Sequence, residues 1–194
     1  EFKKLGIKRL PKNLLQAIKA LKNNIPFDGG EPNDIDIMNS SSNEGLSKEG
    51  VAYFYLLRIA IQWKRQKKIN PDNYKEKLSN FIPVIHKRLS GKVQINFKGF
   101  ENWYSLNSGK PFELQRLRNN EVAPVNDGNF SQRIANQIGI LREKNILSLV
   151  ASKFTSYDKI LIVYGGGHLV KSRLVLTDML GQPILESNKA NNIK

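Results

Sequence analysis

The chain has 194 residues and a mass of 22.1 kDa, which suits one compact domain. It contains no cysteine and two histidines, which excludes disulfide frameworks, thiolate nucleophiles, zinc fingers, iron–sulfur clusters and three-histidine metal sites. Lys and Arg number 31 and Asp and Glu number 17, and the resulting net charge of +14 attracts anions.

The distribution of charged and apolar residues limits further which classes of partner are supported. The basic residues are dispersed, apart from a short run at Lys64, Arg65, Lys67 and Lys68, so a nucleic acid is only weakly supported. No stretch is long and apolar enough to span a membrane, and the first twelve residues lack the apolar run of a signal peptide. We therefore expect a soluble chain. Neither its compartment nor its oligomeric state follows from these features.

Apolar residues recur at helical spacing in five segments, each of which predicts a helix. The predicted helices cover residues 12–23, 47–67, 70–85, 131–153 and 169–180. Ser47 is a good N-cap for the second helix, and Gly181 suits the residue that ends the last one. Pro83 is expected to kink the third helix or to end its first part.

Three further segments predict strands. Residues 25–28 form a short candidate, and alternating apolar residues at 93, 95 and 97 form a second. Residues 160–164 are a continuous run of branched apolar residues and Tyr164, which is typical of a strand buried on both faces of a parallel sheet. The sequence therefore predicts a helix-rich single α/β domain over residues 1–194, with a small, mostly parallel sheet.

A glycine-rich turn follows the predicted strand at 160–164. Gly165, Gly166 and Gly167 would place His168 at the carboxyl end of that strand, where open α/β sheets bind ligands. Their backbone amides could hold an anion, and the imidazole could act as a base, a hydrogen-bond donor or a metal ligand. The alternative is a sharp turn in which His168 only caps the next helix. The motif lacks the Gly-Lys-Ser/Thr of a phosphate-binding loop and the serine of a nucleophile elbow.

A second candidate site is the acidic turn at residues 28–34. Asp28, Glu31 and Asp34 place three carboxylates around a glycine pair, and such groups can ligate a hard divalent cation or act as general acid and base. A hydrated turn held by Asn and Asp side chains is the alternative. Arg142, with Glu143 and Arg133 on the predicted helix at 131–153, forms a third candidate, with surface ion pairing as its alternative.

The residues from 131 to 183 carry a family pattern. Arg142-Glu143-Lys144-Asn145-Ile146-Leu147 is followed, 26 positions after Arg142, by the histidine of Tyr164-Gly165-Gly166-Gly167-His168-Leu169, and then by Leu180-Gly181-Gln182-Pro183. This pattern resembles the carboxyl half of the TraB/PrgY, GumN, Tiki and ChaN superfamily. Those domains carry an arginine followed by Asn or Asp on a helix, and then a buried strand that ends in Gly-x-x-His. Here Glu143 follows the arginine.

The resemblance implies a hydrolase that cleaves an ester or amide bond in a small-molecule or peptide substrate. His168 would activate water or ligate a metal, Arg142 would stabilise a developing oxyanion, and Glu31 or Asp34 would supply a carboxylate. An oxygen-rich metal site would favour manganese, magnesium or cobalt. ChaN-like members imply haem binding instead, with Tyr164 or His168 as the axial ligand.

Two rival functions stay open at this point. One is a non-catalytic module that holds haem or a polyanion in the same cleft, in which Tyr164, residues 165–167 and Arg133 would contact the ligand. The other is a basic nucleic-acid-binding domain. The family also has an amino-terminal strand that ends in glutamate and often histidine, and we find no such element here. We therefore expect either a fragment that lacks this strand or a divergent member without the full site.

Overall fold

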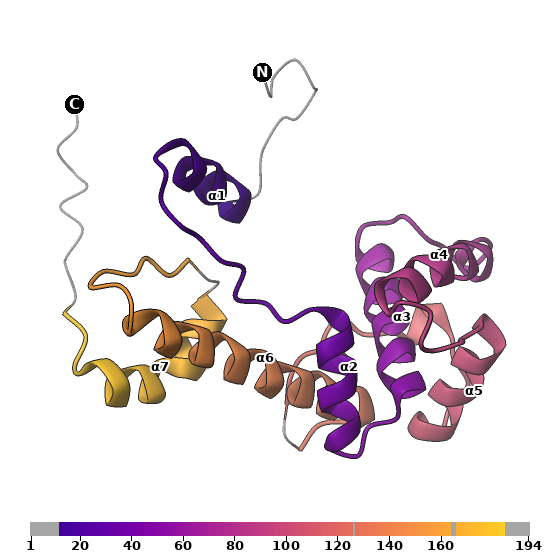
Figure 1. Cartoon of the computed structure of the whole chain (residues 1–194). Helices are drawn as coiled ribbons and strands as arrows, with labels where there is room; N and C mark the ends of the chain where they lie inside the picture. The colour runs from indigo at the N-terminus through magenta and orange to yellow at the C-terminus, as the bar shows by residue number, and fades with distance from the viewer. Residues whose placement is uncertain (1–11, 126, 164–165, 185–194) are drawn as a thin grey trace, which may run out of the picture. The chain divides into compact units, whose positions relative to one another are not determined.

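The computed structural model describes residues 12–125, 127–163 and 166–184, and the regular structure in these ranges is helical (Figure 1). The helices are α1 (Lys12–Lys22), α2 (Asp34–Asn43), α3 (Lys48–Arg65), α4 (Tyr74–Arg88), α5 (Phe97–Ser108), the 3-10 turn η2 (Leu114–Arg116), α6 (Phe130–Phe154) and α7 (Gly166–Leu180). The chain divides into two compact units. The central unit is Glu31–Ile146, and the terminal unit combines Glu1–Gly30 with Leu147–Lys194.

The prediction of an α/β fold with a small, mostly parallel sheet is wrong, because the described residues form no strand. Residues 160–163 are irregular chain, and Leu161 is 83% exposed. Residues 25–28 are irregular too, while 93–96 lead directly into α5. An apolar run becomes a sheet strand only where another strand takes up its backbone hydrogen bonds, and none of the three candidate segments pairs with another in the described chain.

Local hydrogen bonds explain where several helices begin and end. Asn33, Ser47 and Asn96 are the N-caps of α2, α3 and α5, and each side chain accepts a hydrogen bond from a backbone N–H in the first turn at 2.8–2.9 Å. Ser47 is thus confirmed as an N-cap. Gly109 ends α5 in the left-handed region with φ +69°, where a residue without Cβ is favoured.

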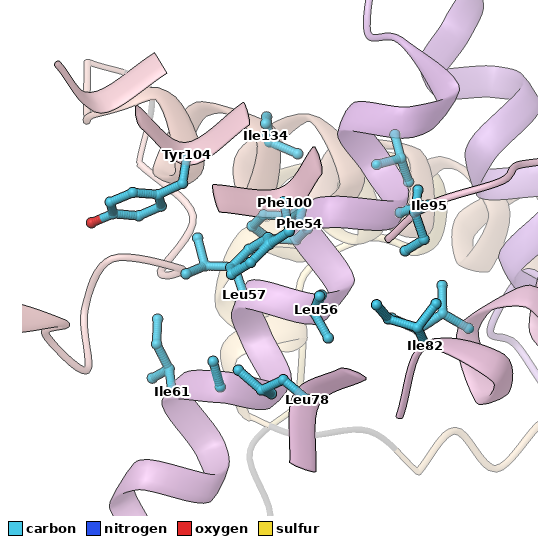
Figure 2. Close-up of a cluster of buried hydrophobic side chains, with 14 of the residues drawn as sticks. Phe54, Leu56, Leu57, Ile61, Leu78, Ile82, Ile95, Phe100, Tyr104 and Ile134 are labelled. Carbon is cyan, nitrogen blue, oxygen red and sulfur yellow. The ribbon is translucent and has the colours of Figure 1, made fainter. Parts of the chain in front are cut away.

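The core of the central unit forms around α3, which packs against α2, α4 and α5. Leu57 of α3, Leu78 of α4 and Phe100 of α5 are all 0% exposed (Figure 2). Phe100 is also the centre of an aromatic group, with its ring 4.7 Å from that of Phe112 and in a T-shaped arrangement. Burial of these large apolar side chains is the main stabilising contribution in the unit.

Two lysines of the central unit donate hydrogen bonds to backbone carbonyls. Lys64 Nζ donates to the carbonyls of Gln115 and Leu117 at 2.9 and 2.6 Å, and Lys77 Nζ donates to the carbonyl of Lys68 at 2.7 Å. The ammonium group has three donors and can therefore serve two acceptors at once. Lys64 in this way ties the η2 segment to the last turn of α3.

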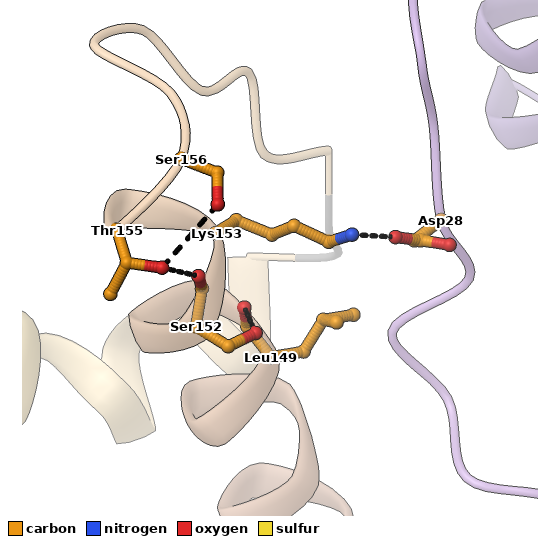
Figure 3. Close-up of polar contacts among 6 residues, drawn as sticks. All are labelled: Asp28, Leu149, Ser152, Lys153, Thr155 and Ser156. Carbon is orange, nitrogen blue, oxygen red and sulfur yellow. Dashed lines mark hydrogen bonds and ion pairs between the residues drawn. The ribbon is translucent and has the colours of Figure 1, made fainter.

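The terminal unit contains α1, α7 and the last turns of α6. Lys153 of α6 pairs with Asp28 at 2.5 Å, and the Thr155 hydroxyl donates to the carbonyl of Ser152 where α6 ends (Figure 3). In α7, Ser172 is 6% exposed whereas Leu174 is 82% exposed. In the part of the chain that the structure describes, no helix is both long and apolar enough to cross a membrane.

We predict that Phe100→Ala destabilises the protein strongly, because it leaves a large cavity in the aromatic core. The expected loss in free energy of unfolding is about 3–5 kcal/mol. Leu106→Ala is the matched control on the same helix, since Leu106 is 85% exposed and its truncation should change stability by less than about 0.5 kcal/mol. Urea denaturation followed by circular dichroism measures both, and equal losses would contradict the described packing of α5.

Candidate functional site

The central unit contains a cavity of about 620 Å³, within the size range of small-molecule sites. Its walls come from the residues around the start of α2, from α3, α4 and α6, and from the chain after η2. The charged groups of the lining are Glu31, Asp34, Arg58, Arg65, Arg88 and Arg142. The four guanidinium groups exceed the two carboxylates, so the cavity carries an excess of two positive charges.

Helix α3 supplies a polar stripe to this cavity. Tyr55, Arg58, Gln62 and Arg65 follow one another at spacings of three or four residues, which places them along one face of the helix. The core residues of α3, such as Leu57, lie on other faces and are buried. Packing of the apolar residues in the core therefore orients the stripe toward the cavity.

Arg142 forms the strongest ion pair of the cavity. Its Nε and Nη2 atoms donate to Oε2 and Oε1 of Glu31, both at 2.6 Å, so the guanidinium and the carboxylate meet in a bidentate arrangement. This hydrogen bonding is the main reason that the pKa of Arg142 is raised. The pair joins the chain just before α2 to α6, across 111 positions of sequence.

A second, weaker ion pair lies at the start of α2. Arg88 Nε approaches Oδ2 of Asp34 at 3.5 Å, with the side chains 58% and 28% exposed. Asp34 is the first residue of α2, where the helix dipole favours a negative charge. Because the partner is largely exposed, we expect this pair to contribute little stability by itself.

The hydroxyl of Tyr55 is buried beside these charges. Its oxygen makes no hydrogen bond of good geometry with any described group. Burial raises the pKa of Tyr55 strongly, and the nearby Asp34 carboxylate raises it further. The hydroxyl therefore stays protonated over the physiological range of pH, with the Asp34 carboxylate as the charged acceptor beside it.

Arg58 and Arg65 are the charged groups of the lining that form no ion pair with a described carboxylate. Neither guanidinium has a hydrogen bond or an ion pair among the described residues. Both side chains are accessible to solvent. Desolvation by the cavity walls lowers the pKa of Arg58, and the positive charge of Arg142 lowers it further. Two cations thus face the cavity without an ion pair or a hydrogen bond to the described part of the protein.

The structure brings together some of the residues that the sequence singles out. Glu31 and Arg142 pair in the cavity, and Asp34 lines the same cavity. Arg133 is exposed on α6 and donates to the carbonyl of Gly128 at 3.1 Å.

The glycine-rich motif lies in the terminal unit. Gly166, Gly167 and His168 form the first turn of α7, and the His168 side chain is partly buried. Tyr164 and Gly165 lie outside the described residues. The predicted position of this motif at a sheet edge is wrong, because residues 160–163 are not a strand and no sheet forms in the described chain.

The predicted metal site is also wrong. No group of three or more His, Cys, Asp or Glu side chains is arranged to hold a metal ion in the described ranges. Glu31 of the predicted set has both carboxylate oxygens bound by Arg142, and Asp34 faces Arg88. Because guanidinium cations already neutralise these carboxylates, they are poor ligands for manganese, magnesium or cobalt.

Sequence reasoning missed Tyr55, Arg58, Arg65 and Arg88 as site residues. The available signal was the polar stripe at positions 55, 58, 62 and 65 of α3, a helix whose buried residues are apolar. Such a stripe ordinarily indicates a solvent-facing helix surface. Only the positions of α4 and α6 show that it lines a cavity.

We predict opposite effects for two tyrosine variants. Tyr55→Phe removes a buried hydroxyl without a hydrogen-bond partner, so it should leave the free energy of unfolding unchanged or raise it by up to about 1 kcal/mol. Tyr104→Phe removes a hydroxyl that donates to Glu121 Oε2 at 3.2 Å, and it should lower stability by about 1 kcal/mol. Chemical denaturation distinguishes the two, and a larger loss for Tyr55→Phe would show that its hydroxyl has a partner.

No family model matches the chain, and neither a curated protein nor a solved structure matches it. The similarity to the TraB, Tiki and ChaN superfamily consequently stays a prediction from the sequence.

Proposed function

We propose that this protein binds an anionic small molecule in the arginine-lined cavity of the central unit. The observation that carries the proposal is the pair of guanidinium groups, Arg58 and Arg65, that face the cavity without a carboxylate partner in the described chain. An anion would supply the missing opposite charges and would accept charge-assisted hydrogen bonds from the planar guanidinium groups of the two arginines.

The electrostatics around Arg58 support the same proposal. Its pKa is lowered by desolvation and by the positive charge of Arg142, which together outweigh the opposite effects of Tyr55 and Asp34, so its charged form is less stable there than in water. A bound anion removes that penalty. Hydrogen bonds to charged groups contribute about 1.5–3 kcal/mol each, which is enough to give measurable affinity from a few contacts.

Hydrolysis of an ester or amide bond stays a prediction from the family resemblance. Its proposed oxyanion-stabilising residue, Arg142, already has Nε and Nη2 bound to Glu31, so anion binding has the more direct support. An esterase or peptidase activity that persists in Arg58→Gln and disappears in His168→Ala would favour hydrolysis through the terminal unit.

We predict that Arg58→Gln weakens the binding of citrate and pyrophosphate to the full chain by about 10- to 100-fold, the loss expected for one charge-assisted contact. Arg116→Gln is the matched control. Arg116 is exposed, pairs with Glu113 at 2.7 Å and does not line the cavity. Isothermal titration calorimetry gives both affinities. If the two variants weaken binding equally, the loss of affinity follows from the overall charge of the protein, and the proposed anion site in the cavity is contradicted.

We also predict that Glu31→Gln strengthens the binding of the same anions several-fold. The substitution removes the carboxylate that holds Arg142 and so releases a third guanidinium toward the cavity. A thermal melt of the variant checks that it folds. An unchanged or weaker affinity in a folded variant would show that Arg142 does not face the bound anion.

A further inference from the structure

We infer that the ligand of this cavity is an elongated dianion, with an acidic group at each end and an apolar middle. The inference rests on the proposed function and names the class of molecule that the cavity would select. It follows from the placement of the two cations that lack an ion pair in the described chain, from the total charge of the lining, and from the apolar surface between them.

These two cations stand apart along one helix. Arg58 and Arg65 are seven positions apart on α3, which is about two turns and a rise of roughly 10 Å. Both line the same cavity, and Gln62 lines it between them. A neutral side chain therefore separates the two guanidinium groups, and one compact anion would have to draw both long side chains away from their own turns of the helix.

The charge of the lining agrees with two negative charges on the ligand. Glu31 and Asp34 already offset Arg142 and Arg88, which leaves the excess of two positive charges on Arg58 and Arg65. A dianion brings the summed charge of the lining and the ligand to zero. A more highly charged ligand would place additional negative charge near the carboxylates of Glu31 and Asp34.

The surface across the cavity from this stripe is partly apolar. Phe81 and Ile85 of α4 and Ile138 of α6 all contribute to the lining. A hydrocarbon or aromatic segment is favoured against such a wall because its burial removes apolar surface from water. Cationic groups separated along α3, with apolar side chains opposite, therefore fit a molecule that is charged at its ends and apolar between them.

The experiment uses α,ω-dicarboxylates from succinate to dodecanedioate and, for each, the monocarboxylate of equal length. Calorimetry on the full chain should show an affinity maximum near suberate and sebacate, whose extended carboxylates match the rise of roughly 10 Å between the two arginines. Octanoate should bind at least tenfold more weakly than suberate. In Arg58→Gln and in Arg65→Gln, suberate should lose that advantage over octanoate, while Arg116→Gln keeps it.

The outcomes separate this inference from the proposed function. Equal affinities for suberate and octanoate, or affinity that rises steadily with chain length, would overturn the dianion and leave an anion site with an apolar tail. Loss of suberate binding in Arg58→Gln alone, with Arg65→Gln unaffected, would also overturn it. If no carboxylate, citrate or pyrophosphate binds in a manner that depends on Arg58, the proposed function itself is wrong. The length profile of the wild-type chain tests the dianion even where a variant is unstable.

Discussion

The burial of α3 among α2, α4 and α5 is the constraint on which the described site depends. Leu57 and its apolar neighbours fix the rotation of the helix, and that rotation leaves Arg58 and Arg65 facing a cavity rather than the core. The bidentate pair between Arg142 and Glu31 then closes the same region, because it links α6 to the chain that enters α2. Hydrophobic packing thus determines the position of the charges, and the charges determine what the cavity can accept.

Several parts of this structure follow from local sequence. Helical periodicity at 12–23 corresponds to α1, Ser47 caps α3 as expected, and Gly181 follows α7 with φ +83°, in the left-handed conformation that suits a residue after a helix end. The caps and the helical periodicity depend on contacts within a few residues, which a sequence records directly. Pro83 is an exception, because the sequence predicts that it kinks the third helix or ends its first part, whereas α4 runs from Tyr74 to Arg88 through it.

The sheet and the cavity could not be predicted in the same way. Residues 160–163 have the composition of a buried strand, but a strand also requires a partner strand, and composition gives no information about one. The acidic turn becomes the start of α2, where Asp34 faces Arg88. Glu31 and Arg142 belong to separate sequence motifs, and their contact across 111 positions depends on helix packing that no local pattern reports.

The hydrogen bonds of Lys64 show that the net charge of the chain is not a count of the cations available to a partner. This lysine belongs to the densest basic run in the chain, yet its ammonium group is committed to the carbonyls of Gln115 and Leu117. The carbonyl acceptors leave the positive charge of Lys64 intact, but they hold its ammonium group against the backbone of the protein. A count of basic residues therefore overstates the cations that a long polymer such as DNA would meet, and high ionic strength should loosen such a polymer without loosening this internal tether.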